Sequence, residues 1–147
     1  MDIVTNKKAR FNYEIQDDLE AGIALVGTEV KALRAKRVNL TDSYATFKRD
    51  ELFLINARIE PYEHGNIHNH DPVRARKLLL HRKELDKLKG KLQQKGWVLV
   101  PMKLYFTRGK VKVKLGLGKS KKNFDKRQTI KDRDIKRDME REMKNYR

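Results

Sequence analysis

Lysine alternates with Val or Leu from Lys110 to Leu115, and this is the most regular hydrophobic pattern in the chain. Successive side chains of a strand point to opposite faces, so the pattern predicts a strand with lysines on one face and core residues on the other. The segment from Trp97 to Phe106 is apolar on both faces and predicts a buried strand. We expect Tyr105 and Phe106 to pack in the core rather than stack on a ligand.

Shorter apolar runs predict further strands. Tyr44 to Arg49 and Leu52 to Ile55 flank Asp50-Glu51 and predict a hairpin. Phe11 to Ile15 and Ile23 to Val26 predict two more strands.

Two segments have apolar residues at helical spacing. One runs from Glu29 to Arg37, with Val30 and Leu33 on one face. The other is marked by leucines that stop before Gly96, which are Leu78, Leu85, Leu88 and Leu92. Many short strands with two helices predict a mainly β fold, a small antiparallel barrel.

Large hydrophobic residues become sparse after Gly118, which predicts a folded domain over 1–118 and a tail over 119–147. Ile135, Met139 and Met143 recur at i, i+4 and i+8 and would form a narrow apolar stripe on a helix. Burial of so narrow a stripe does not offset the entropy cost of ordering the backbone, which is about 1–2 kcal/mol per residue. We therefore expect a tail that is disordered when free and helical when bound.

The charge balance indicates a polyanionic partner. The 147 residues include 36 Lys and Arg against 20 Asp and Glu, a formal net charge of +16, of which the tail carries 12 basic and 6 acidic residues. No apolar run approaches the roughly 18 residues that span a bilayer, which disfavours a membrane. The N-terminal residues lack a secretory pattern and the chain has no cysteine, so we expect a cytoplasmic protein without disulfides.

Basic residues gather in several short clusters. Each cluster alone is typical of a solvated face, but their number favours RNA. They are 7–10, 31–37, 74–77, 110–114 and 119–122.

Catalytic chemistry has little support in the sequence. His64, His68, His70 and Asp71, with His81 downstream, form the one cluster that could bind a metal, but the loop leaves most ligand positions unassigned. We interpret it as a solvated loop ahead of a helix. No nucleophile or phosphate-loop motif is present, and 116–118 is expected to let the chain leave its last strand. The sequence predicts no enzyme activity, no metal and no cofactor.

Ordered blocks along the whole chain resemble the SsrA-binding protein family, also called small protein B. The blocks are Asn6-Lys-Lys-Ala9, Glu20-Ala-Gly-Ile23, Gly27-Thr-Glu-Val-Lys31, Asn39-Leu-Thr-Asp-Ser-Tyr44, Arg74-Ala-Arg-Lys-Leu-Leu-Leu-His81, Lys112-Val-Lys-Leu-Gly-Leu117 and Phe124-Asp-Lys-Arg127. The resemblance implies a bacterial oligonucleotide-binding-like barrel that binds the tRNA-like domain of transfer-messenger RNA and delivers it to stalled ribosomes. It also implies that the tail enters the decoding centre and the empty mRNA channel.

The resemblance assigns roles to particular residues. Asn6, Glu20 and Leu79 match positions important for RNA binding, and an acidic Glu20 would hydrogen-bond Asn6, a base or a ribose rather than attract phosphate. The other residues expected to bind RNA are Lys7, Lys8, Lys31, Asn39, Arg74, Arg76, Lys77, Lys119, Lys121 and Lys122.

In the tail, Asp125, Lys126 and Arg127 match the family's decoding-centre motif, and the stripe of Ile135, Met139 and Met143 fits a helix formed inside the ribosome. Phe124 stands where family members carry His or Tyr, so it keeps a ring for stacking and lacks the polar edge.

Two other functions fit part of the pattern. An ordinary ribosomal protein would be equally basic, and it would be present on every ribosome. A His-dependent metal nuclease would use His68 and His70 and would be inhibited by EDTA.

Overall fold

The computed structural model describes residues 1–62 and 69–121, together with Arg133, Ile135 and Arg137. Its elements in chain order are β1 (Asp2–Thr5), α1 (Lys7–Asn12), β2 (Tyr13–Ile23), α2 (Gly27–Arg34), β3 (Val38–Asn39), β4 (Tyr44–Lys48), β5 (Glu51–Ile55), β6 (Arg58–Ile59), β7 (Arg76–Leu79), α3 (Arg82–Leu92), β8 (Trp97–Thr107) and β9 (Lys110–Ser120).

Six antiparallel strands close into a barrel. Their order around the ring is β8-β4-β5-β7-β2-β9, and β9 pairs back onto β8. Strand β1 adds to β8 beside Lys103 and Tyr105, beyond the point where β4 pairs with Leu99. The prediction of a mainly β antiparallel barrel is therefore confirmed.

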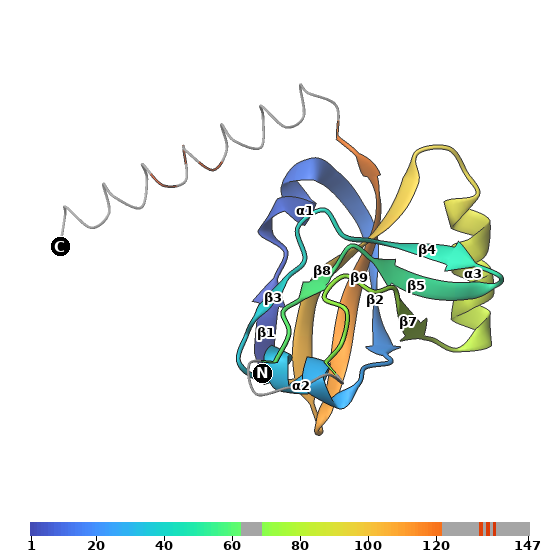
Figure 1. Ribbon diagram of the computed structural model, residues 1–147. Helices are drawn as coiled ribbons and strands as arrows, with labels where there is room; N and C mark the ends of the chain where they lie inside the picture. The colour runs from blue at the N-terminus through green and yellow to red at the C-terminus, as the bar shows by residue number, and fades with distance from the viewer. Residues whose placement is uncertain (63–68, 122–132, 134, 136, 138–147) are drawn as a thin grey trace.

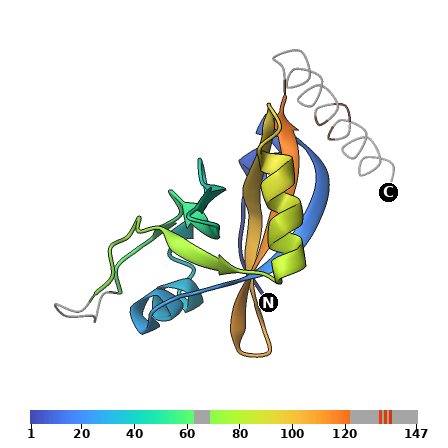
Figure 2. The same cartoon turned by 90° about the vertical axis from the view of Figure 1, so that its right-hand side faces the viewer.

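The three long strands β2, β8 and β9 form one tall wall of the barrel (Figures 1 and 2). Helix α3 lies along this wall, α2 lies at the end where the β8–β9 hairpin turns, and α1 lies at the opposite end, where β9 finishes. β9 alternates core and outward residues from Lys110 to Leu115, so its lysines lie on the outer side of the wall, whereas β8 is buried on both sides from Leu99 to Met102.

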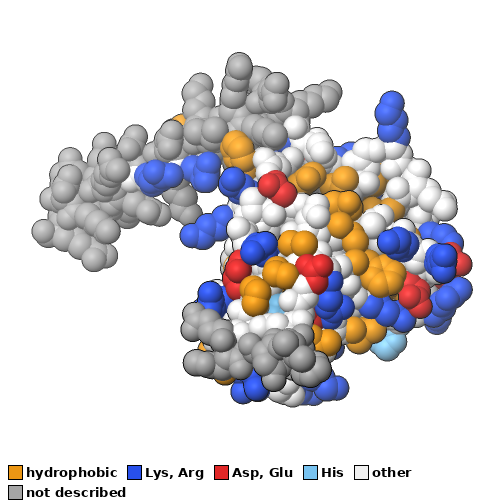
Figure 3. Space-filling model, in the orientation of Figure 1, with side chains coloured by type: hydrophobic (Ala, Val, Ile, Leu, Met, Phe, Trp, Pro, Cys, Tyr) orange, Lys and Arg blue, Asp and Glu red, His pale blue; other side chains and the backbone are white. Residues whose placement is uncertain are grey.

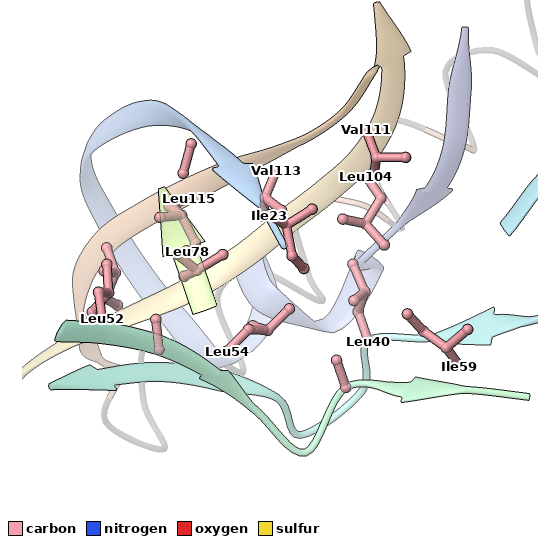
Figure 4. Packing of buried hydrophobic residues seen from close by; sticks show 14 of the residues in the cluster. Ile23, Leu40, Leu52, Leu54, Ile59, Leu78, Leu104, Val111, Val113 and Leu115 are labelled. Carbon is pink, nitrogen blue, oxygen red and sulfur yellow. The ribbon is translucent and has the colours of Figure 1, made fainter. Parts of the chain in front are cut away.

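The barrel interior is filled by aliphatic side chains. Leu78, Val113 and Leu115 from the β7 and β9 walls point toward Leu52 and Leu54 of β5 (Figure 4). All five are at most 2% exposed, so they form a dry core. A smaller cluster, in which Ala9 of α1 covers Val100 and Met102, lies on the other side of β8.

The alternation from Lys110 to Leu115 is confirmed: Val111, Val113 and Leu115 are buried in β9, and the intervening lysines lie on the outer face. The strand from Trp97 to Phe106 appears as β8, and the hairpin as β4 and β5 paired from Tyr44 to Lys48. Both helices exist, as α2 and α3.

Three local predictions were wrong. Phe11 begins no strand, because 7–12 form α1 and β2 starts at Tyr13; β2 then ends at Ile23, so 24–26 are not a strand either. Leu78 belongs to β7 rather than to the helix, and its spacing from Leu85 only imitates a helical period. The two predicted strands are the two ends of the single strand β2, and its middle was missed because Gln16 to Asp18 is exposed and contains a bulge.

The last strand continues to Ser120, past the predicted domain boundary at residue 118. Gly116 and Gly118 are buried within it, so they do not release the chain as expected. Of the predicted tail stripe, Ile135 is described; it is helical and 54% exposed. Lys122, Phe124, Asp125, Lys126, Arg127, Met139 and Met143 lie outside the described residues.

Among the described residues, no helix is long and apolar enough to cross a membrane.

Candidate nucleic-acid interface

The outer side of the wall formed by β2, β9, β8 and the end of β7 carries one continuous set of outward side chains. Strand register places Lys114 opposite Glu20 and Lys103, and Lys112 opposite Gly22 and Tyr105. Directly opposite residues of antiparallel strands share a face. We call this set the lysine face, and its members are Glu20, Gly22, Leu79, Lys103, Tyr105, Lys112 and Lys114.

Polar contacts tie the lysine face together. The Tyr105 hydroxyl donates a hydrogen bond to Oε2 of Glu20, and the Lys103 ammonium lies 5.3 Å from the centre of the Tyr105 ring. Lys114 pairs with Asp18 at 3.5 Å. Burial raises the pKa of Tyr105 to about 12, and the bonded Glu20 carboxylate adds to the rise. Core packing was the wrong prediction for Tyr105, whereas Phe106 does pack against the core.

A first hollow, of about 310 Å³, lies where the lysine face meets α1, and we call it the α1 hollow. Asn6 lines it but is 9% exposed, and its Nδ2 donates to the carbonyl oxygens of Pro101 at 3.0 Å and Leu40 at 3.4 Å. Asn6 therefore fixes the start of α1 against β8. The charged groups around this hollow are Asp2, Lys7, Arg10, Lys103 and Lys114.

A second hollow, of about 370 Å³, lies at the other end of the lysine face, and we call it the Leu79 hollow. Leu79 is 49% exposed there, on the outward side of β7. Glu20 and Lys112 line the same hollow, with Gly22, Leu80, His81 and Glu84. The structure thus brings together Glu20 and Leu79, two residues that the resemblance picked from distant parts of the sequence. The expected bond between Glu20 and Asn6 is not made, because Glu20 bonds Tyr105.

Arg76 was expected to bind RNA, and the structure contradicts this prediction. Its side chain is fully buried, and its guanidinium binds Glu29 and the carbonyl oxygens of Ala57 at 2.7 Å and Pro72 at 3.1 Å. Arg74 binds the same carboxylate at 2.5 Å and is one third exposed. A guanidinium so enclosed holds the segment before β7 against α2 and cannot reach a phosphate.

Opposing effects set the pKa values of this cluster. Burial raises the pKa of Glu29, but hydrogen bonds from Arg74, the Val26 amide and Arg76 outweigh it, so the net shift is downward. Burial lowers the pKa of Arg76, against the opposing effect of Glu29. Sequence reasoning missed Glu29, since an acid in the first turn of a helix is ordinary.

The remaining predicted contacts are spread around the barrel. Lys77 lies on the outward side of β7 with Leu79 and pairs with Glu51 at 3.1 Å. The Lys31 ammonium on α2 lies 5.2 Å from the centre of the Tyr62 ring. The Lys119 ammonium lies 4.9 Å from the centre of the Trp97 ring. Asn39 accepts a hydrogen bond from the Thr41 amide at 2.8 Å, Lys8 is exposed on α1, and Lys121 follows the end of β9. Figure 3 shows such cations interspersed with acidic and apolar side chains on the face drawn there.

His70 was expected in a solvated loop and is instead buried. Its Nε2 is 2.8 Å from the carbonyl oxygen of Ile59 and its Nδ1 is 2.9 Å from the Thr28 hydroxyl. Because a carbonyl only accepts, Nε2 carries a proton and the ring holds its segment in place. His64 and His68 lie outside the described residues, and the described part of the chain contains no group of three or more metal ligands.

Comparisons with known proteins identify the family of this chain. The family model described as "SmpB protein" matches residues 3–145. SsrA-binding proteins of Bacillus subtilis and Nostoc are 57% and 55% identical over 92% and 98% of this chain, and over 87% and 94% of their own lengths. A solved chain from the structure "tmRNA-SmpB: a journey to the center of the bacterial ribosome" is 54% identical, with a TM-score of 0.70 over 84% of this chain and 87% of that one. The chain belongs to the SmpB family.

Proposed function

We propose that this chain is a non-enzymatic RNA-binding adaptor. It binds the tRNA-like domain of transfer-messenger RNA and delivers it to stalled ribosomes for trans-translation. The relatives are named for binding SsrA, and the similar solved chain comes from a structure named for tmRNA, SmpB and the ribosome. The protein therefore acts where translation takes place, in the bacterial cytoplasm.

The lysine face is the observation that carries the RNA-binding role. Three outward lysines on paired strands, with Lys7 and Arg10 beside them, form a cationic surface whose shape is fixed by a barrel. Lysines held this way attract phosphates without losing backbone freedom on binding. Leu79 and Tyr105 add apolar and polar contacts that can recognise one RNA rather than any polyanion.

The tail supplies the second activity in this proposal. Residues 119–147 carry a net charge of +6, and the motif at 124–127 is assigned to the decoding centre with the later stripe in the mRNA channel. The barrel domain binds one RNA and the tail contacts another.

A reconstituted translation system stalled on an mRNA without a stop codon tests this function. With transfer-messenger RNA and this chain present, stalled peptides should acquire the encoded tag, and without the chain they should not. Equal tagging in both reactions would contradict the adaptor role. Tagging with a ribosomal protein of similar charge in place of this chain is the matched control and should fail.

A further inference from the structure

We propose that Trp97 is a positioning residue that holds Lys91 and Lys119 as a pair of phosphate-binding cations at the end of the barrel where the tail begins. The pair lies on the other side of the sheet from the lysine face and contacts the RNA that the tail enters. The inference deepens the proposed function and rests on it.

The two lysines reach one aromatic ring from different elements. The Lys91 ammonium, on the last turn of α3, lies 4.3 Å from the centre of the Trp97 ring, and the Lys119 ammonium of β9 lies 4.9 Å from it. Strand register places Lys119 directly opposite Trp97. The ring itself is partly buried against the barrel core. A fixed ring that attracts both cations therefore brings like charges from a helix and a strand close together.

The pair has no counter-charge within the described part of the chain. The neighbouring Lys89 of α3 binds the carboxylate of Asp50, whereas Lys91 forms no such ion pair among the described residues. Glu14 stands opposite Lys119 on β2, yet these two side chains do not pair. Like charges held together repel, so an anion bound to both ammoniums relieves the repulsion.

Alternation along β9 separates this pair from the lysine face. Lys114 points outward from the wall. Lys119 instead shares the side of Leu115 and Leu117, whose side chains fill the core. Because Lys119 follows the last of these leucines and is exposed, it emerges at the end of the barrel. An RNA that covers the lysine face therefore leaves Lys119 accessible to a second RNA.

The tail leaves the barrel beside this pair. Ser120 is paired with Tyr13, and the Lys121 amide donates a hydrogen bond to the carbonyl oxygen of Asn12 at 2.9 Å. These contacts fix the start of the tail next to Lys119. Phosphate contacts set the position and orientation of a protein on a nucleic acid. A phosphate bound by the pair thus orients the barrel on the RNA that the tail enters.

The test measures Kd of the full chain for ribosomes stalled on a truncated mRNA, and separately for the tRNA-like domain of transfer-messenger RNA, over a range of salt concentrations. Lys91→Gln should weaken ribosome binding by about tenfold. It should also make the slope of log Kd against log salt shallower by up to about one unit. Its Kd for the tRNA-like domain should equal that of the parent chain.

Lys83→Gln is the matched control for this charge change. It removes an exposed lysine from the first turn of the same helix, about 12 Å along the axis from Lys91. It should bind ribosomes and the tRNA-like domain as the parent chain does.

Variants of Trp97 test the positioning role without changing any charge. Trp97→Leu keeps both lysines but removes the ring that holds them, so ribosome binding should weaken by about tenfold while the salt slope stays that of the parent. Trp97→Phe keeps an aromatic face and should recover most of the lost affinity. Thermal unfolding and the Kd for the tRNA-like domain check that the barrel is intact in each variant.

Four results would overturn the inference while the parent chain still prefers its own RNA and supports tagging. They are a salt slope of Lys91→Gln equal to that of Lys83→Gln, an equal loss of affinity for the tRNA-like domain, the parent's ribosome affinity in Trp97→Leu, and no recovery in Trp97→Phe. Loss of the parent's preference for its RNA, or tagging that does not need the chain, would instead contradict the proposed function.

Discussion

At the scale of single residues, the buried carboxylate of Glu29 binds two arginines and connects two parts of the barrel. It binds Arg76 and Arg74, and through them it ties α2 to the start of β7. A buried ion pair contributes little net stability compared with apolar packing, but leaving one of its charges without a partner is costly. The barrel wall that carries Leu79 therefore depends on a cluster hidden behind it.

Arg76→Ala should lower the free energy of unfolding by about 3–5 kcal/mol, because it leaves part of the Glu29 charge uncompensated in the core. Lys77→Ala is the matched control. It removes the neighbouring cation, which forms an exposed pair with Glu51, and should cost about 1 kcal/mol or less. Urea unfolding measures the loss in free energy of unfolding for both variants. Equal losses would show that Arg76 has no special structural role.

Acid should destabilise the protein through Glu29. Its pKa in the folded state is lower than the ordinary glutamate value of 4.5, so its contribution to stability is complete above pH 4.5 and is lost as the pH falls through the folded-state pKa. Glu29→Gln should be less stable at neutral pH and should lose less stability below pH 4.5. Urea unfolding across pH measures both slopes, and parallel curves for the two proteins would refute this assignment.

The resemblance named Glu20 and Leu79 for RNA binding without saying where they lie, and the structure places both at the Leu79 hollow. Motifs record which residues recur and not why. Tyr105, the partner of Glu20, was missed, since an aromatic residue in an apolar run has the same sequence pattern whether it faces the core or the outer wall. Arg76 was misassigned for the opposite reason: in a row of basic residues, burial depends on the strand's face, and only the fold determines it.

Strand β9 determines how the elements fit together. It pairs with both β2 and β8, and Gly118 is where β2 comes closest, so that a Cβ there would collide with the backbone of Glu14. The alternating lysines predicted this strand and its faces. Its two glycines suggested an exit from the sheet, because the sequence cannot distinguish a glycine at a close approach from one at a turn.

Gly118→Ala should destabilise the barrel by about 1–3 kcal/mol, because backbone on the neighbouring strand cannot move aside as a flexible side chain could. Gly90→Ala in α3 is the control. Nothing lies within 4 Å of the added carbon, and alanine should stabilise this helix by about 0.5–1 kcal/mol. Thermal unfolding should move the two midpoints in opposite directions. An unchanged midpoint for Gly118→Ala would contradict the packing argument.

At the scale of the whole molecule, the lysine face and the tail are separate parts of one adaptor. The face lies along the wall of the barrel, and the chain leaves the last strand at Ser120, beyond the α1 end of that wall. We propose that the two parts contact different RNAs at the same time.

Truncation after Lys122 should leave the affinity for the tRNA-like domain within about tenfold, or 1.4 kcal/mol, of the full chain. It should abolish peptide tagging on stalled ribosomes, because the residues assigned to the decoding centre are gone. Filter binding and the reconstituted tagging reaction measure the two effects on one preparation. A larger loss of RNA affinity would place an essential RNA contact in the tail.

The most direct test of the account is the Kd of the full chain for the tRNA-like domain of transfer-messenger RNA, compared with an unrelated RNA of tRNA size, at physiological salt. A specific adaptor should prefer its own RNA by more than tenfold, whereas a cationic surface alone would bind both equally. We expect the preference. Equal affinity for the two RNAs would contradict the account.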